Sequence, residues 1–259
     1  MLEVEEVRAV GKRIRTMAGL ATFPVGVSLL AGGGTPGIAR LEGTRYCQAL
    51  MWARHGESVL LDALGLACPA AARAFGFRPL PEKLASGEGL VSFGIVGDPA
   101  VGRAMFYRMP VIEAGTVRTL QLSPLERAER IPDVVVVEDE VERLMWIALA
   151  GLNAEEGRRI ESSTAILQAA CVDSTVVPFL EDRMNLSYGC YGCRDATDMA
   201  PGEAVLGFPL RMLLSIEREL SRLGQKAMPA SRAKRAYESL KAQAEARASQ
   251  GDCAHRLDG

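Results

Sequence analysis

Residues 133–137, Asp-Val-Val-Val-Val, are the most informative starting point for the fold. Four consecutive valines lack the alternation of apolar and polar residues that a strand with one solvent-exposed face requires. They therefore predict a strand that is covered on both faces. The segment from Glu140 to Leu149 predicts the helix that follows it. A buried strand that leads directly into a helix indicates a sheet with helices packed over it.

The chain before this strand predicts further helices and strands. Residues 3–20 carry apolar side chains at spacings of three and four, which is typical of an amphipathic helix. Residues 23–30 predict a strand, residues 44–55 a helix and residues 59–62 a short strand. Residues 68–75 predict a second short helix, because Pro69 suits the first position of a helix.

The remaining segments complete a mixed pattern. Residues 90–96, 103–109 and 116–122 contain Val and Phe between Gly and Pro residues, and we expect three antiparallel strands. Residues 162–180 fit a strand followed by a helix, although periodicity does not settle this. The sequence then predicts a glycine-punctuated loop or strand end over 185–194, helices over 209–223 and 230–248, and a frayed tail over 249–259.

No internal repeat or linker divides the chain between residues 24 and 222. We therefore expect a single α+β domain over residues 1–259, built on a mixed sheet that is flanked by helices and followed by C-terminal helices. A chain of 259 residues with 48% hydrophobic and 24% charged residues is long enough to bury a substantial core.

Charge and hydropathy exclude two classes of partner. The 30 basic and 32 acidic side chains give a net charge of −2, which provides no field to attract nucleic acid. The acidic N-terminus lacks the pattern of a secretory signal, and no apolar run reaches the roughly 20 residues that cross a bilayer. We expect a cytoplasmic protein that binds neither nucleic acid nor a membrane, with a homodimer as the default oligomeric state.

The six cysteines are the strongest chemical signal. They are too sparse for a secreted disulfide scaffold, and in a reducing compartment their thiols remain free for packing, metal binding or catalysis. Cys190 and Cys193 form a Cys-x-x-Cys pair, a spacing that zinc sites, iron–sulfur sites and redox dithiols share. The adjacent Gly189 and Gly192, with the early Asp195, favour a loop there over the helix start of a thioredoxin-type pair.

The other cysteines are less distinctive when each is considered alone. Cys68 lies at a helix N-terminus, where the helix dipole favours thiolate, although a buried structural cysteine fits equally well. Cys47 and Cys171 have apolar neighbours, as core residues do. Cys253 lies in the polar tail beside His255, and we interpret it as incidental.

Histidines and glycine-rich segments offer no stronger alternative. The two histidines lack the partners of a histidine-based zinc enzyme or a Ser-His-Asp hydrolase. The glycines at 32–34 lack the residues of a nucleotide-binding loop and are best interpreted as a turn. Arg45, Arg73 and Arg194 each lie within five residues of a candidate cysteine. They are either surface arginines or groups that bind an anionic substrate or offset the charge of a thiolate-ligated cluster.

Several motifs together resemble the domain-of-unknown-function family 169, also called the ArCR family, over about residues 20–222. The resemblance implies motif positions rather than a reaction, because the family has no firmly assigned activity. It maps family cysteines onto Cys47, Cys68, Cys171 and Cys190, whereas Cys193 departs from the pattern. The motifs that carry it are Arg45-Tyr46-Cys47, Cys68-Pro69-Ala70 with Arg73-Ala74-Phe75-Gly76-Phe77, Pro132-Asp133-Val-Val-Val, Gly189-Cys190-x-Gly192-x-Arg194 and Gly207-Phe208-Pro209.

Four cysteines from distant segments, with no histidine among them, favour an iron–sulfur cluster over catalytic zinc. The leading hypothesis is a four-iron four-sulfur protein that transfers electrons to a partner protein or acts on a small anionic substrate. The alternatives are a structural zinc protein without catalytic activity and a metal-free thiol enzyme that uses Cys68 or Cys190, so enzymatic activity stays open. The candidate metal ligands are Cys47, Cys68, Cys171, Cys190 and Cys193, and the candidate substrate-binding residues are Arg45, Arg73 and Arg194.

Overall fold

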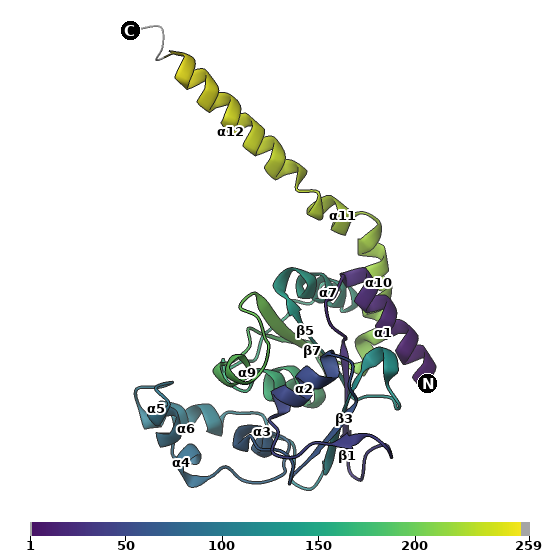
Figure 1. Cartoon of the computed structure of the whole chain (residues 1–259), viewed down its shortest axis with the longest axis vertical. Helices are drawn as coiled ribbons and strands as arrows, with labels where there is room; N and C mark the ends of the chain where they lie inside the picture. Colours follow the sequence, from purple (N-terminus) through teal and green to yellow (C-terminus); the bar gives the residue numbers. More distant parts are fainter. Residues whose placement is uncertain (1, 255–259) are drawn as a thin grey trace. The chain divides into compact units, whose positions relative to one another are not determined.

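The computed structural model describes residues 2–254 and gives side chains to residue 247. The chain divides into two compact units, Met1–Leu220 and Ser221–Gly259. The first unit contains a mixed sheet with helices around it (Figure 1), and helices follow at the C-terminal end, so the predicted α+β class is confirmed. No helix within residues 2–254 has both the length and the apolar character needed to cross a membrane.

The sheet within the described residues has seven strands in the order β2-β3-β4-β1-β5-β7-β6. Strands β2 and β3 are parallel, and every other neighbouring pair is antiparallel. The predicted strands over 23–30, 59–62 and 116–122 are confirmed. The strands are β1 (Val25–Leu30), β2 (Ala39–Arg40), β3 (Val59–Asp62), β4 (Thr119–Pro124), β5 (Val134–Glu140), β6 (Asn185–Ser187) and β7 (Glu203–Pro209).

Helices lie along both faces of this sheet and continue into the second unit. A π-helix, Ala169–Val176, is followed directly by α8 (Val177–Glu181). The other helices of the first unit are α1 (Val4–Ala18), α2 (Tyr46–Arg54), α3 (Pro69–Ala74), α4 (Glu82–Ala85), α5 (Glu88–Ser92), α6 (Pro99–Tyr107), α7 (Val141–Ala154) and α9 (Tyr191–Ala196). Helix α10 (Leu213–Gln225) spans the unit boundary. Helices α11 (Ala227–Arg232) and α12 (Arg235–Ala254) lie in the second unit.

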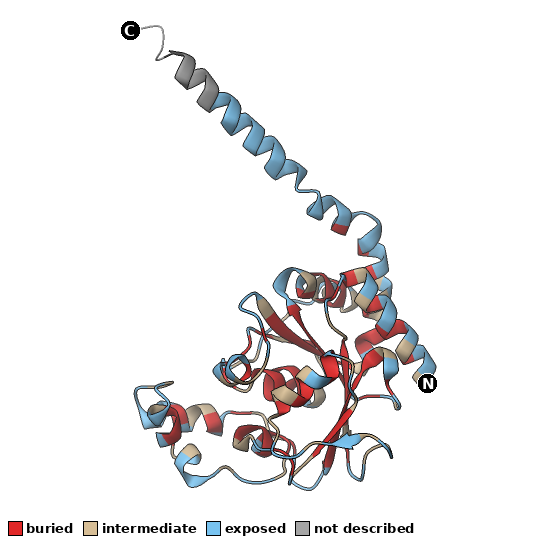
Figure 2. Ribbon diagram, viewed as in Figure 1, coloured by how far each residue is buried: buried red, intermediate tan, exposed pale blue. Residues whose placement is uncertain are grey.

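The valine strand β5 is covered on both faces, as predicted. All four valines of β5 are buried (Figure 2). Val134 and Val136 belong to the hydrophobic cluster that contains residues of α2, α3 and the π-helix. Val135 and Val137 point to the other face because strand side chains alternate, and α7 packs against β5. Burial on both faces explains why the segment has no polar alternation.

Two of the predicted strands are helices instead. Residues 90–96 and 103–109 were expected to be strands, but residues 90–92 lie in α5, residues 93–96 form no strand, and residues 103–107 lie in α6. Asp98 caps α6 by accepting a hydrogen bond from the backbone N–H of Ala100 at 2.7 Å, and Pro99 occupies the first turn. An acidic cap followed by proline is a helix-start signal, and here it outweighs the β-propensity of the valines and phenylalanines.

Two other segments also differ from expectation. Residues 162–180 contain the π-helix and α8 rather than a strand followed by a helix. Residues 185–194 contain β6, which agrees with the expected strand end, and the start of α9, which was not expected. Strand β7 was not predicted, although its Gly-Phe-Pro segment was noted as a motif.

Candidate cysteine-lined functional site

The five candidate cysteines, although scattered along the sequence, line one cavity of about 800 Å³. Cys47 comes from the first turn of α2, and Cys68 is the N-cap of α3. Cys171 lies in the π-helix, Cys190 is the N-cap of α9, and Cys193 lies in α9. Cys171, Cys190 and Cys193 are buried, whereas Cys47 and Cys68 are partly exposed. All five are free thiols.

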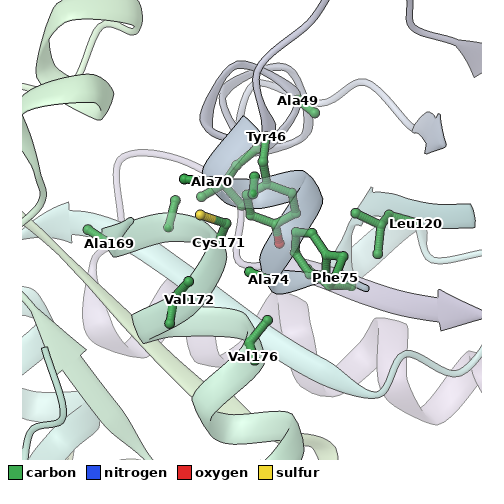
Figure 3. Packing of buried hydrophobic residues seen from close by; sticks show 14 of the residues in the cluster. Tyr46, Ala49, Ala70, Ala74, Phe75, Leu120, Ala169, Cys171, Val172 and Val176 are labelled. Carbon is green, nitrogen blue, oxygen red and sulfur yellow. The ribbon is translucent and has the colours of Figure 1, made fainter. Parts of the chain in front are cut away.

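Tyr46 joins the helix that carries Cys47 to the helix that carries Cys171. Its ring is fully buried and packs on Phe75 of the α3 region, with ring centroids 5.0 Å apart. Its hydroxyl lies 2.7 Å from the Thr175 hydroxyl, which donates to the carbonyl of Ala170. Figure 3 shows this packing, with Cys171 beside Tyr46 and Ala70. One side chain therefore connects three of the segments that supply cysteines.

The π-helix is positioned by a close approach to the sheet. At Gly207 in β7, a Cβ atom would lie 1.9 Å from the carbonyl oxygen of Ser174, so no larger residue fits without a shift of backbone. The buried Asn185 of β6 donates a 2.8 Å hydrogen bond to the carbonyl of Asp173. These contacts explain the glycine of the Gly-Phe-Pro motif, because its missing side chain sets the depth of the helix that carries Cys171.

Asp173 holds the loop before the π-helix in place. Its Oδ2 accepts hydrogen bonds from the hydroxyls of Thr164 at 2.5 Å and Ser187 at 2.7 Å. Burial raises the pKa of Asp173 to about 6, although both hydrogen bonds act in the opposite direction. Ile166 and Gln168, between Thr164 and the helix, have positive φ angles of 58°. This conformation is uncommon for residues with a side chain.

The Cys190-x-x-Cys193 pair opens a helix, which corrects the predicted loop. Its two sulfur atoms lie 3.2 Å apart, and the Cys190 sulfur accepts a hydrogen bond from the backbone N–H of Cys193 at 3.4 Å. Gly189 has φ +88°, so the chain reverses just before the helix rather than within it. The glycines were correctly expected to turn the chain, but the turn precedes the pair.

The pKa values of the deepest thiols are raised. Burial raises the pKa of Cys171 well above its usual value, and nearby cysteines add to this effect. The hydrogen bond to Cys193, together with burial, raises the pKa of Cys190. The hydrogen bond from Cys190 lowers the pKa of Cys193, but the contact with Cys47 and burial outweigh it and raise the value to about 12. Without a bound cation, these buried sulfurs are therefore protonated at neutral pH.

The thiols of the described residues are not arranged around a single metal ion. Within residues 2–247, no three Cys, His, Asp or Glu side chains converge closely enough to hold a single ion. Four thiolates around one zinc ion at about 2.3 Å would lie about 3.8 Å from one another. In this structure the sulfurs of Cys190 and Cys193 lie 3.2 Å apart, and the other three cysteines reach the same cavity from separate segments of the chain.

Of the three predicted substrate-binding arginines, only Arg45 lines the cavity. Its guanidinium lies 3.4 Å from the carboxylate of Asp195 and 3.4 Å from the carbonyl oxygen of Gly192. Arg73 is exposed on α3 and is not among the lining residues. Arg194 donates to the carbonyls of Tyr188, Ala200 and Glu203, and it is also absent from the lining. Arg194 therefore links the segments that precede and follow α9.

A buried ion network lies behind the site and connects its supporting elements. Arg54, at the end of α2, is 3% exposed and contacts Glu138 of β5 at 3.2 Å. It also contacts Asp198 at 2.6 Å and Glu203 of β7 at 3.3 Å. His55 pairs with the same Asp198 at 2.6 Å, outside the cavity. The network fixes α2 against the segment that follows α9, and thereby the spacing between Cys47 and Cys193.

Several residues of the site were missed from the sequence. Tyr46 and Gly207 were noted only as parts of motifs, and Asn185 only as the start of a segment. Lys83 of α4 lines the cavity but lies far from any cysteine in the sequence, so proximity along the chain could not identify it. The side chains of Cys253 and His255 lie outside the described residues.

Comparisons with known proteins identify one family. The family model of domain-of-unknown-function family 169, described as uncharacterised ArCR, matches residues 13–219. The match covers all five cavity cysteines and most of the chain, as the sequence motifs indicated. No curated protein and no solved structure matches the chain.

Proposed function

The chain belongs to the domain-of-unknown-function family 169, and since that family's description names no activity, we propose a function from the site itself: the cavity binds an iron–sulfur cluster of the four-iron four-sulfur type. The ligands would come from the five candidates Cys47, Cys68, Cys171, Cys190 and Cys193. The cluster would serve electron transfer to a partner protein or chemistry on a small anionic substrate.

The convergence of the cysteines carries this proposal. Every cysteine outside the C-terminal tail lines the same cavity, and each of four separate segments brings at least one of them there. Free cysteine is often buried singly as a small apolar residue, but packing alone gives no reason for five thiols to gather in one place. Burial, with the proximity of the other cysteines, raises the pKa of Cys171, and a bound cation would act in the opposite direction.

The chemistry of the donors favours a cluster over a single ion. Thiolate is the usual ligand of iron–sulfur clusters, and no histidine lines this cavity within the described residues. A cluster is larger than one ion and spreads its ligands farther apart, which suits thiols that come from four separate segments of the chain. Five candidate cysteines for four ligand positions would leave one thiol unligated, and Cys193, which departs from the family pattern, is the proposed spare.

A bound cluster would supply one-electron transfer or, with one iron open, Lewis acidity. The chain's own residues exclude water and hold charge nearby. The cavity wall is largely apolar, with Ala70 and Leu167 next to the cysteines. Arg45 offers a guanidinium at the cavity, close to α9. We also propose a cytoplasmic location, where thiols stay reduced, and a homodimer.

The metal-free alternative has one observation in its favour. The sulfurs of Cys190 and Cys193 lie 3.2 Å apart at the start of a helix, an arrangement that redox dithiols share. However, the pKa of Cys190 is raised rather than lowered, and thiolate is the nucleophilic form. A structural zinc site is the second alternative, and it would require the thiols to move closer together.

The experiment is anaerobic purification followed by visible absorption spectroscopy. The proposal predicts brown protein with a broad thiolate-to-iron band that bleaches on reduction or exposure to oxygen. Colourless protein that contains one zinc and no iron would support the structural zinc site. Colourless, metal-free protein that loses activity when one cysteine is alkylated would support the thiol enzyme. Either colourless result contradicts the proposal.

A further inference from the structure

The cavity extends beyond the cysteines to a second wall of different chemistry. Its volume of about 800 Å³ lies within the range of small-molecule sites. The cysteines and Arg45 occupy one side, on α2, α3, the π-helix and α9. A second set of lining residues comes from α4, α5, α6 and the turns between them, which supply Leu84, Leu90, Phe93, Ile95 and Phe106. This second wall contains no cysteine, so cluster binding does not explain it.

The second wall is a compact helical unit. Helices α4, α5 and α6 pack against one another. A Cβ at Gly87 would lie 2.0 Å from the carbonyl oxygen of Pro99, and a Cβ at Gly102 would lie 2.9 Å from the carbonyl oxygen of Gly87. The two glycines therefore let the turn before α5 cross α6 in direct backbone contact. The apolar side chains are held on a fixed frame that faces the cysteines.

Most side chains of the second wall are apolar, and contact between them and water in an empty cavity is unfavourable. Leu90 and Phe106 are 4% and 6% exposed, whereas Phe93 is 63% exposed. An apolar surface that lines a cavity, with an exposed aromatic ring beside it, is typical of sites that bury the apolar part of a small ligand.

The charged residues that line the cavity indicate the sign of the charge on its ligand. Lys83 of α4 and Arg45 of α2 are the cationic lining residues, and Asp195 is the acidic one. Asp195 lies 3.4 Å from Arg45 and offsets its charge. Among residues 2–247, Lys83 forms no ion pair. The lining therefore carries one net positive charge, and the ammonium of Lys83 is free to pair with an anion.

We propose that this cavity binds a small amphipathic monoanion, such as an aryl or alkyl carboxylate or sulfonate, and that Lys83 is its charge-binding residue. The inference rests on the proposed function in one respect: such a ligand would be the anionic substrate placed beside the cluster. The apolar body contacts the wall formed by α4, α5 and α6. The anionic group pairs with Lys83, and Arg45 provides a second cationic donor at the cavity.

The test compares two fluorescent probes of similar shape but different charge. 8-Anilinonaphthalene-1-sulfonate is a monoanion, and N-phenyl-1-naphthylamine is its uncharged counterpart. Both are titrated into the full chain, into Lys83→Met and into the control Lys12→Met, which removes an exposed lysine on α1 outside the cavity. We expect Lys83→Met to weaken binding of the anionic probe by about fivefold. Binding of the neutral probe and of both probes to Lys12→Met should not change.

A second variant tests where the probes bind. Ser92→Trp places a large ring at a lining position and should weaken both probes by tenfold or more while near-ultraviolet circular dichroism stays native. Full binding to a natively folded Ser92→Trp protein would overturn the proposal, because the probes would then lie elsewhere. An unchanged anionic affinity in Lys83→Met, or equal losses for both probes, would also overturn it. If Ser92→Trp does not fold, the proposal is tested by the comparison of the two probes in Lys83→Met alone.

Iron is measured on the same samples. Charge-selective binding without iron would refute the cluster but retain the monoanion site. Iron without charge-selective binding would refute the monoanion site but retain the cluster.

Discussion

Individual thiols in this cavity differ in exposure and in their neighbours, and these differences assign their roles. Cys171, Cys190 and Cys193 are buried among one another, where burial keeps them protonated in the absence of a cation. Cys47 and Cys68 are partly exposed. The two partly exposed cysteines each start a helix, with Cys68 at an N-cap. Cys47 and Cys68 are therefore the cavity thiols that solvent and solutes reach most readily.

Single Cys→Ser substitutions test the proposed ligands. Replacement of Cys47, Cys68, Cys171 or Cys190 should remove most of the iron, because serine is a poor substitute for a thiolate ligand. Cys193→Ser should retain more iron than these four if Cys193 is the spare thiol. The measurement is iron per chain after anaerobic purification, with Cys253→Ser as the control. Equal iron in all five cavity variants and the control would refute the assignment.

Gly207 is the residue whose substitution should affect folding most directly. In Gly207→Ala, the new Cβ would lie 1.9 Å from the Ser174 carbonyl oxygen, so the π-helix or β7 must shift. We expect a loss of about 2–4 kcal/mol in the free energy of unfolding, measured by urea denaturation. Gly202→Ala is the matched control, because a Cβ there meets nothing within 4 Å. Equal stability of the two variants would show that the close approach between Gly207 and Ser174 does not contribute to the free energy of unfolding.

Helix α2 and the π-helix form the rigid part of the site. The link between the Tyr46 and Thr175 hydroxyls joins them in the buried core. Tyr46→Phe removes this hydrogen bond but keeps the ring packing on Phe75. We expect a loss of about 1 kcal/mol in the free energy of unfolding. Tyr107→Phe, at an 88% exposed position, is the control and should have no effect on it. A Tyr46→Phe protein as stable as this control would exclude a structural role for the link.

The elements that could be predicted from sequence are those with strong local signals. The helix over 3–20 has a clear apolar stripe, and the valine strand has no polar face. The prediction of a strand over 103–109 was wrong because Asp98-Pro99, the start signal of α6, was given too little weight. The prediction over 90–96 was also wrong, but α5 begins after Gly87 without a side-chain cap, so the sequence gives no comparable signal there. A π-helix could not be predicted, because its position depends on Gly207 and Asn185 from later in the chain.

The whole first unit depends on a buried ion network around Arg54, and this network makes its stability sensitive to pH. Burial raises the pKa of Glu138 to about 7; Arg54 opposes this shift, and Glu203 and Asp198 add to it. The folded state therefore binds a proton on Glu138 more tightly than the unfolded state does. Between about pH 4.5 and pH 7, the free energy of unfolding should fall as the pH rises.

Glu138→Gln tests this dependence. Glutamine does not titrate, so the variant should lose the Glu138 part of the decrease, which is on the order of 3 kcal/mol. The measurement is urea denaturation at several pH values between 4 and 8, with the exposed Glu88→Gln as the control. Asp173, whose pKa burial raises to about 6, should still contribute a decrease of the same sign in the variant. Identical slopes in wild type and Glu138→Gln would contradict the account.

The site could be predicted from sequence only in part. Residue type pointed to the cysteines, and the resemblance to a family linked those at positions 47, 68, 171 and 190. Arg73 and Arg194 were chosen because they lie near cysteines in the sequence, but one is exposed outside the cavity and the other binds backbone carbonyls. Lys83 belongs to a wall that only the tertiary structure brings opposite the cysteines.

Chemical analysis of iron and acid-labile sulfide, on protein kept from oxygen throughout purification, addresses the proposed cluster without any assumption about substrate or partner. We predict iron and sulfide in equal amounts, about four of each per chain. One zinc per chain without iron or sulfide, or no metal at all, would contradict the cluster.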